Sequence, residues 1–332
     1  MSVSPNTQAV LLLTAHFAKS RKDAVKPLTP KEWGRFALWL KEKPLTPEQL
    51  MTGRLGDLLK DWTDKTITLE RIEGLMDRGS ALALAMEKWL RAGLWVMTRS
   101  DPDYPVRLKK RLRTDSPAIL FGCGNRALLN GGGLAVVGSR NAAEQDLAYC
   151  RDLGALAASN GYSIVSGGAR GVDETAMQGA LEAEGTVIGI LADSLLRACS
   201  TARYRKYLVA NNLVLISTFH PEAGFNAGNA MQRNKYIYCL SDAAMVVHSG
   251  EKGGTWSGAM ENVKKQWTPL WVKRTTDHTT GASVNQPGPL LASHRAANKL
   301  KGHILLIDNF NKKGKPLYSG VLSTTILVKW LS

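Results

Sequence analysis

One stretch of the sequence, LAVVGSRNAAEQD, places a small residue, a hydroxyl and a guanidinium directly after an apolar run. Gly138 lets the backbone turn sharply at the end of a strand. Ser139 and Arg140 then stand where the N–H groups and dipole of a following helix favour an anion, and a guanidinium can donate two hydrogen bonds to one phosphate. The pattern predicts a phosphate site. The alternative is that Arg140 only forms a salt bridge to Glu144 or Asp146 of that helix.

Three further stretches, SGGARGVD, QRNK and KGGTWSGA, combine glycines, hydroxyls and cations next to predicted strands or helices. Loops that follow the strands of one parallel sheet meet at one edge of it, so we predict that all four stretches converge on one phosphate-binding pocket. The predicted binding residues are Gly138, Ser139, Arg140, Ser166, Gly167, Arg170, Gly171, Arg233, Asn234, Lys235, Gly254 and Thr255. Asp173, in the second stretch, is expected to cap the next helix.

Few other side chains are candidates for chemistry. His220 and His248 follow predicted strands, but no carboxylate or cysteine lies at ligand spacing in the sequence, so we interpret them as polar loop residues and predict no metal site. Trp256 is a candidate platform for stacking a base, with core packing as the alternative. Because G-x-G-x-x-G is absent, we predict no dinucleotide cofactor, and we assign no catalytic residue.

The elements that must position these loops alternate between strand and helix. Apolar runs rich in Val, Ile and Leu predict strands at 134–137, 163–166, 186–191, 213–217, 243–247 and 269–272. The clearest helix between them carries an inward stripe of Leu147, Cys150, Leu153 and Ala157. Uniformly apolar strands that alternate with helices predict an α/β fold with a doubly wound, mostly parallel sheet.

The chain before this region has a helical pattern. Capping boxes at Thr29 with Glu32 and at Thr46 with Gln49 mark two helix starts, and an apolar stripe at helical spacing follows the second. We predict a helical domain at 1–95, a proline-rich connector at 96–130, the sheet domain at 131–272, and a basic C-terminal extension at 273–332. The extension contains two apolar runs, HILLID and VLSTTILVKWL, which are expected to complete the sheet.

The charge balance indicates an anionic partner. The 332 residues carry a formal charge of +15, and nucleic acid is the commonest partner of such a chain. Residues 1–130 hold 22 basic against 14 acidic side chains and 271–332 hold 9 against 2, whereas 131–270 hold 12 of each. The sheet domain must therefore bind an anion with individually placed arginines.

The cysteines and the apolar runs bear on the compartment. Cys123, Cys150, Cys199 and Cys239 are far apart with no C-x-x-C pair, which favours a reducing compartment and buried thiols over a disulfide or zinc. The N-terminal run AVLLL is too short for the apolar region of a signal peptide, and no stretch approaches a membrane span. We therefore expect a cytoplasmic protein with no membrane contact.

Taken together, the blocks VGSR, SGGARGVD, QRNKYI and GGTWSGA resemble, in order and spacing, those of the DprA/Smf proteins, the DNA-processing proteins of bacterial natural transformation. The stretch SDPDYPVRLKKRLRTDSPAILFGCGN is similar to the family's lead-in, and the resemblance covers roughly residues 46–272. The chain departs from the family where Ala176-Met177 replaces A-H, Lys235 replaces an arginine, and WVKR replaces V-P-G; no winged-helix tail is recognisable.

The resemblance implies a Rossmann-like domain after a helical SAM-like domain. It also implies a homodimer that binds single-stranded DNA without known catalysis and passes it to a RecA-type recombinase. Carried over by position, the DNA contacts would be Ser139, Arg140, Arg170, Arg233 and Lys235.

Two alternative functions are compatible with the same fold. Divergent DprA-like proteins also serve as antitoxins or DNA sensors in toxin–antitoxin or anti-phage modules, beside phosphoribosyltransferase-like effectors. The wider superfamily includes nucleoside-monophosphate phosphoribohydrolases with P-G-G-x-G-T-x-x-E. Here the carboxylate, Glu261, stands six residues after Thr255 instead of three, so the sequence offers no evident acid or base and predicts no enzyme.

Overall fold

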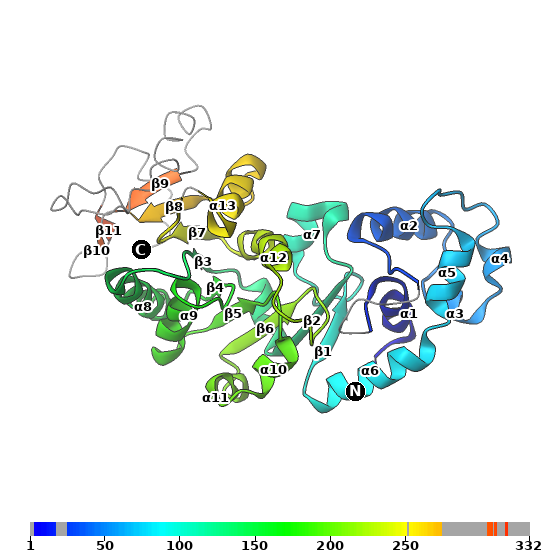
Figure 1. Cartoon of the computed structure of the whole chain (residues 1–332), viewed down its shortest axis with the longest axis horizontal. Coiled ribbons are helices and arrows are strands. Elements are labelled where there is room, and N and C mark those ends of the chain that lie inside the picture. The colour runs from blue at the N-terminus through cyan, green and yellow to red at the C-terminus, as the bar shows by residue number, and fades with distance from the viewer. Residues whose placement is uncertain are drawn as a thin grey trace.

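The computed structural model describes residues 3–17, 25–250 and 252–273, together with the backbone of 304–307, 309–310 and 316–317. Its centre is a nine-stranded sheet in the order β1-β2-β6-β5-β4-β3-β7-β8-β9 (Figure 1). The strands are β1 (Trp95–Thr98), β2 (Ile119–Gly124), β3 (Leu134–Val137), β4 (Ile164–Ser166), β5 (Val187–Ile190), β6 (Leu213–Ser217), β7 (Ala243–Val246), β8 (Leu270–Lys273) and β9 (Ile304–Ile307). A separate antiparallel pair joins β10 (Asn309–Phe310) to β11 (Pro316–Leu317).

In the nine-stranded sheet, all neighbours from β6 to β9 are parallel, whereas β2 pairs antiparallel with both β1 and β6. The chain moves outward from β3 to one side through β4, β5 and β6, then returns to the other side of β3 with β7 and β8. The predicted α/β class with a doubly wound, mostly parallel sheet is confirmed. The strand order reverses between β3 and β7, which is where such sheets bind ligands.

Helices cover both faces of the sheet, because successive side chains of a strand point to opposite sides. Leu134 and Val136 of β3 join the core under α8 (Glu144–Ser159) and α9 (Val172–Glu182). Ala135 and Val137 join the core under α12 (Ala227–Leu240) and α13 (Gly254–Lys265). The helices that follow β1 are α7 (Val106–Leu112), α8 (Glu144–Ser159), α9 (Val172–Glu182), α10 (Leu195–Ser200), α11 (Ala202–Val209), α12 (Ala227–Leu240) and α13 (Gly254–Lys265), with 3-10 turns η1 (Arg113–Asp115) and η2 (Arg126–Asn130).

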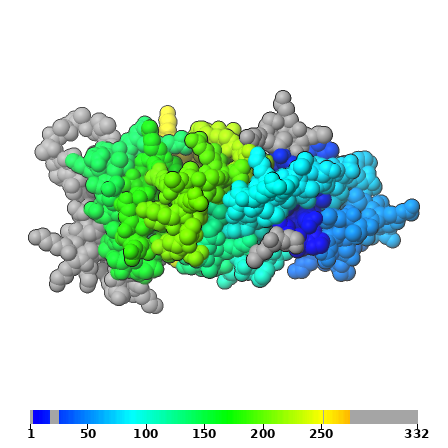
Figure 2. Space-filling view, turned by 90° about the horizontal axis from the view of Figure 1, so that it is seen from below, coloured from blue at the N-terminus to red at the C-terminus, as the bar shows by residue number. Residues whose placement is uncertain are grey.

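Within the described residues, six helices precede the sheet and form one end of the molecule, blue to cyan in Figures 1 and 2. They are α1 (Pro5–Thr14), α2 (Pro30–Glu42), α3 (Gln49–Thr52), α4 (Leu55–Leu58), α5 (Leu69–Met76) and α6 (Gly79–Arg91). The capping box at Thr29 and Glu32 is present at the start of α2. The helix predicted after Thr46 is instead two short helices, because the extended backbone of Gly53 and Arg54 interrupts it.

The segment 96–130, predicted as a connector, contains part of β1 and all of α7 and β2. β1 pairs with β2, and β2 pairs with β6, so this segment extends the sheet. At the other edge, β9 of the C-terminal extension pairs in parallel with β8. The second apolar run of the extension lies outside the described residues. The division of the chain into domains stays a prediction.

The cysteine prediction is wrong for two of the four residues. Cys123 of β2 and Cys199 of α10 form a disulfide, with 6.4 Å between their Cα atoms. The pairing arises because β2 lies beside β6 in the sheet and α10 packs against β6, which brings together residues 76 apart in sequence. Cys150 and Cys239 are buried thiols, as expected, and burial raises the pKa of Cys150 to about 12.

No helix among the described residues is both long enough and apolar enough to cross a bilayer.

Candidate functional site

A cavity of about 440 Å³, called here the switch-point cavity, lies at the carboxyl ends of β3 and β7. It is lined by the loop after β3, by the glycine-rich loop after β7, and by one side of α12. Seven of the twelve predicted binding residues line it: Gly138, Ser139, Arg140, Arg233, Asn234, Gly254 and Thr255. Three of the four predicted stretches therefore bring predicted residues to one cavity at the point where the strand order reverses, whereas none of the binding residues predicted in SGGARGVD lines it.

Backbone and side-chain hydrogen bonds hold the loop after β3 in place. The Ser139 N–H donates to the carbonyl of His248 at 2.9 Å. The Asn141 N–H donates to Ser139 Oγ at 3.1 Å, and Thr255 Oγ1 donates to the carbonyl of Gly138 at 3.0 Å. The strand-end loops of β3 and β7 are thus fastened to each other, which fixes the direction in which Arg140 leaves the backbone.

The side chain of Arg140 is exposed, and its guanidinium lies over the ring of Phe225, 4.6 Å from the centroid. The predicted alternative, a salt bridge to the helix that follows, does not occur among the described residues. Asp146 instead lies 3.0 Å from Nδ1 of His248 and 2.6 Å from Nζ of Lys273. The charge of Arg140 is therefore available to a ligand.

Arg233 is buried, with 4% of its surface exposed, although the sequence suggests an accessible cation. Its Nη1 donates to the carbonyl of Ile190 at 2.8 Å and lies 3.9 Å from Oδ2 of Asp173. Desolvation raises the pKa of Asp173 and lowers that of Arg233, while each charge favours the ionised form of the other. Among the described residues, Nε of Arg233 has no hydrogen-bond partner.

Gly167 makes room for this arginine, because a Cβ atom on Gly167 would lie 1.3 Å from Nη1 of Arg233. Its N–H donates to Asp173 Oδ2 at 3.2 Å. The expectation that Asp173 caps α9 is wrong, since Gly171 occupies the N-cap position and no side chain caps the helix. The second stretch thus supports a buried ion pair in the wall of the cavity.

The remaining predicted residues have different positions. Asn234 Nδ2 donates to the carbonyl of Gly254 at 3.0 Å and joins α12 to the loop after β7. Ser166 is buried and donates to the carbonyl of Val136. Arg170, Gly171 and Lys235 do not line the switch-point cavity: Arg170 is exposed and donates to Asn141 Oδ1, Gly171 turns the backbone with φ of 89°, and Lys235 lies over the Tyr236 ring.

Three side chains singled out by the sequence take no part in lining this cavity. Trp256 is half-buried and packs against the core of α12 and α13, which agrees with the core alternative. His248 pairs with Asp146, a carboxylate 102 residues away, and His220 packs edge-on against Trp89. No group of three or more His, Cys, Asp or Glu side chains among the described residues could hold a metal.

Sequence reasoning missed the apolar side of the site. Phe225 is 58% exposed and Met231 is 50% exposed, and both line the cavity. Neither belongs to a glycine or cation motif, so the sequence gives no signal that would distinguish them from core residues.

The fold and the site together define a Rossmann-like protein with an arginine-bearing pocket at the topological switch point. A family model described as DNA recombination-mediator protein A matches residues 95–287, and the chain belongs to this family, that of the DprA/Smf proteins. The matched region begins at β1, so it includes the segment that the sequence suggested to be a connector.

Individual relatives agree with this assignment. The chain is 29% identical over 165 residues to DNA processing protein DprA of Bacillus subtilis, covering 49% of this chain and 55% of the relative. It is 33% identical over 154 residues to Protein Smf of Escherichia coli, covering 46% and 41%. The chain thus spans about half the length of the curated relatives it matches. A DprA structure from Streptococcus pneumoniae has the same fold, with a TM-score of 0.62 at 17% identity over 92% of this chain and 95% of that one.

Proposed function

We propose that this protein binds single-stranded DNA and acts as a recombination mediator, without catalysing a reaction itself. The observation that carries the proposal is the position of Arg140. It is exposed, forms no ion pair within the described part of the chain, and stands beside an exposed aromatic ring at the switch point of a doubly wound sheet.

Each part of the cavity has a role in this proposal. Arg140 and the Ser139 hydroxyl hold a phosphate of the backbone. The exposed Phe225 ring stacks on a base, which any base can satisfy. Arg233, fixed behind them by Asp173 and Ile190, adds a positive charge that does not need to be ordered on binding. Such contacts read no base edge, so affinity is expected to depend little on sequence.

The enzyme alternative receives no support from the geometry. Glu261, the carboxylate that a phosphoribohydrolase would need, is exposed on α13 and does not line the switch-point cavity. The comparisons give the antitoxin alternative no support either. Passing DNA to a RecA-type recombinase and forming a homodimer are part of the proposal, and light scattering at micromolar concentration, with and without DNA, tests the dimer.

Fluorescence anisotropy tests the central claim. Labelled single strands of several unrelated sequences, and the duplex of each, are titrated with the full chain at moderate salt. We expect similar affinities for the single strands and weaker binding to every duplex. Equal or tighter binding to duplex would contradict the proposal.

A further inference from the structure

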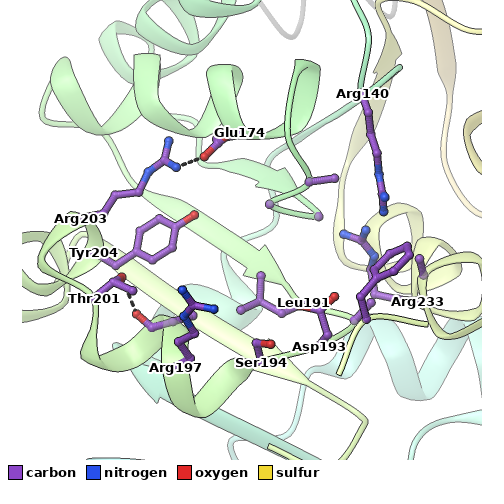
Figure 3. Close-up of a pocket in the computed structure, with 17 residues that line it drawn as sticks. Arg140, Glu174, Leu191, Asp193, Ser194, Arg197, Thr201, Arg203, Tyr204 and Arg233 are labelled. Carbon is purple, nitrogen blue, oxygen red and sulfur yellow. Dashed lines mark hydrogen bonds and ion pairs between the residues drawn. The ribbon is translucent and has the colours of Figure 1, made fainter. Parts of the chain in front are cut away.

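A second cavity, of about 520 Å³, lies next to the switch-point cavity at the carboxyl ends of β4 and β5 (Figure 3). We call it the α10–α11 cavity, because these two helices form its outer wall. Arg140, Phe225 and Arg233 line both cavities. The two cavities are therefore adjacent, and these three side chains form the partition between them.

The charge of this second cavity is also positive. Arg140, Arg197, Arg203 and Arg233 line it, against the carboxylates of Glu174 and Asp193. Arg203 forms an ion pair with Glu174, and the Asp193 charge, like that of Asp173, favours the ionised form of Arg233. Arg197 is exposed and, like Arg140, has no ion-pair partner among the described residues. Two arginines from different elements are thus available to an anionic ligand.

The partition itself indicates where an anion would lie. Arg140 and Arg233 line both cavities. Burial is the main cause that lowers the pKa of Arg233, and the charge of Arg140 lowers it further. Two guanidinium groups that face the same space repel each other, and an anion between them would offset that repulsion. Arg233 is buried, with 4% of its surface exposed, and among the described residues its Nε has no hydrogen-bond partner. We therefore expect an anionic ligand that extends from one cavity into the other to contact the protein at this partition.

Each side of the α10–α11 cavity pairs a guanidinium with an aromatic ring. Arg140 lies on one side of the cavity, and Arg203 and Tyr204 lie on the other (Figure 3). Arg140 lies over the Phe225 ring, and Arg203 lies 5.6 Å from the centroid of the Tyr204 ring. Between them the lining includes the apolar Leu191. Alternating cations and rings of this kind suit a chain of stacked bases joined by phosphates.

We propose that a single DNA strand passes from the switch-point cavity over the Arg140–Phe225 partition into the α10–α11 cavity. The next phosphate is held by Arg197, and the next base lies on Tyr204. This inference rests on the proposed function and extends it, because it assigns a second nucleotide subsite on the surface of α10 and α11.

The test compares Arg197→Ala and Tyr204→Ala with Arg205→Ala, which removes an exposed arginine of α11 that lines neither cavity. Binding of decathymidylate to the full chain is measured over a series of salt concentrations. Loss of one charge-assisted contact should weaken binding about tenfold or more, and Arg197→Ala should lower the slope of log affinity against log salt by about 0.7. Tyr204→Ala should weaken binding about fivefold or more with the slope unchanged. Arg205→Ala should behave as the wild type.

The double variant Arg140→Ala/Arg197→Ala distinguishes one phosphate from two. If the arginines hold different phosphates, the two reductions in salt slope add; if the double variant loses no more slope than either single one, the second subsite is excluded. If Arg205→Ala weakens binding as much as Arg197→Ala, the effect comes from the overall positive charge and not from a contact in the cavity, which also overturns the inference.

The outcomes separate this inference from the proposed function. Weakening by Arg140→Ala without weakening by Arg197→Ala overturns the second subsite and leaves the first intact. No weakening by Arg140→Ala overturns the proposed function. A last experiment measures the binding of free thymidine monophosphate. If this binding depends on Arg197 and occurs at concentrations that do not displace decathymidylate, the cavity binds a separate mononucleotide instead of the strand, which overturns the inference.

Discussion

The guanidinium of Arg140 lies over the ring of Phe225, with 4.6 Å between the guanidinium carbon and the ring centroid. The first residue belongs to the Gly-Ser-Arg loop after β3, and the second precedes α12. The fold thereby places a phosphate-binding group and a base-stacking surface against each other, and each can orient the other before DNA arrives.

Arg140→Ala is expected to weaken single-strand binding by about 1.5 to 3 kcal/mol, the range for a hydrogen bond to a charged group. The salt slope should fall by about 0.7, the contribution of one phosphate on a single strand. Because Arg140 pairs with no carboxylate of α8, the melting temperature of the Arg140→Ala variant should equal that of the wild type. Lys109→Ala, which removes a cation of α7 that lies over the Tyr104 ring, is the control. A lowered melting temperature with unchanged affinity would show that Arg140 is structural.

Phe225→Ala should weaken binding by about 1 to 3 kcal/mol, the value of one base stacked on an aromatic ring. Since no charge is removed, the salt slope should not change, which distinguishes this variant from Arg140→Ala. Phe225→Tyr keeps the ring and should retain the affinity. Anisotropy titrations with one single strand are sufficient, and equal weakening by both substitutions would exclude stacking.

Gly167→Ala should destabilise the protein, because the new methyl group would occupy the position of Arg233 Nη1. The buried guanidinium would lose its hydrogen bond to Ile190, at a cost of about 1 to 3 kcal/mol. Gly224→Ala is a matched control, since a Cβ atom there meets nothing within 4 Å. Urea denaturation of both variants measures the difference. Equal midpoints would show that Arg233 is not held as described.

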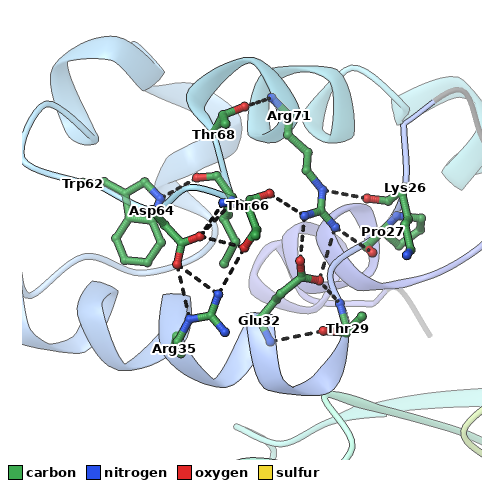
Figure 4. A network of polar contacts seen from close by, with 11 residues as sticks. Lys26, Pro27, Thr29, Glu32, Arg35, Trp62, Asp64, Thr66, Thr68 and Arg71 are labelled. Atoms are coloured by element: carbon green, nitrogen blue, oxygen red, sulfur yellow. Dashed lines mark hydrogen bonds and ion pairs between the residues drawn. The ribbon is translucent and has the colours of Figure 1, made fainter.

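Glu32→Gln tests the polar network of the N-terminal helices (Figure 4). Arg71 donates to Glu32 at 2.8 Å and also to the carbonyls of Lys26, Pro27 and Thr66. The Arg71 hydrogen bond and those of Thr29 lower the pKa of Glu32 from 4.5 to about 2 despite partial burial.

Because this pKa is lower in the folded chain than in the unfolded one, the ionised carboxylate stabilises the fold above pH 4.5, and the contribution is lost as the pH falls towards 2. Glu32→Gln should therefore cost about 1 to 3 kcal/mol at neutral pH, and the difference from wild type should shrink between pH 4.5 and 2. Asp61→Asn removes an exposed partner of Lys43 and is the control. If the stability difference between Glu32→Gln and the wild type did not depend on pH, the ionised Glu32 carboxylate would not be the source of the stabilisation.

The Cys123–Cys199 disulfide predicts that two thiols react with a thiol reagent in denaturant before reduction and four react afterwards. Closing a loop between residues 76 apart in sequence typically stabilises a fold by about 2 to 4 kcal/mol. Cys123→Ser/Cys199→Ser should therefore unfold at a lower urea concentration. Four reactive thiols without reductant would show that the bond is absent in solution.

The sequence predicted the sheet well because strands buried on both faces appear as continuous apolar runs. Six of these runs correspond to β3 to β8. β1 and β2 were not predicted, because Pro102, Pro105 and Pro117 made the segment around them resemble a connector. These prolines end helices but allow a strand on either side.

The site could be predicted only in part. Glycines and cations after strands located the loops, since topology alone brings strand ends together. Whether a cation is accessible depends on packing, so nothing in the sequence distinguishes the buried Arg233 from the exposed Arg140. Phe225, Arg197 and Tyr204 follow no motif, and only the fold brings them to the cavities. The disulfide likewise depends on the strand order.

The Cys123–Cys199 bond closes the chain between these residues into a covalent ring. The loop that carries Arg140 lies inside this ring, whereas Arg233 and Thr255 lie outside it. A protease that cuts once beside the exposed Asn141 would open the ring without releasing a fragment. The cut chain would migrate as one species without reductant and as two with it, and both halves of the phosphate-binding loop would remain tethered to the sheet.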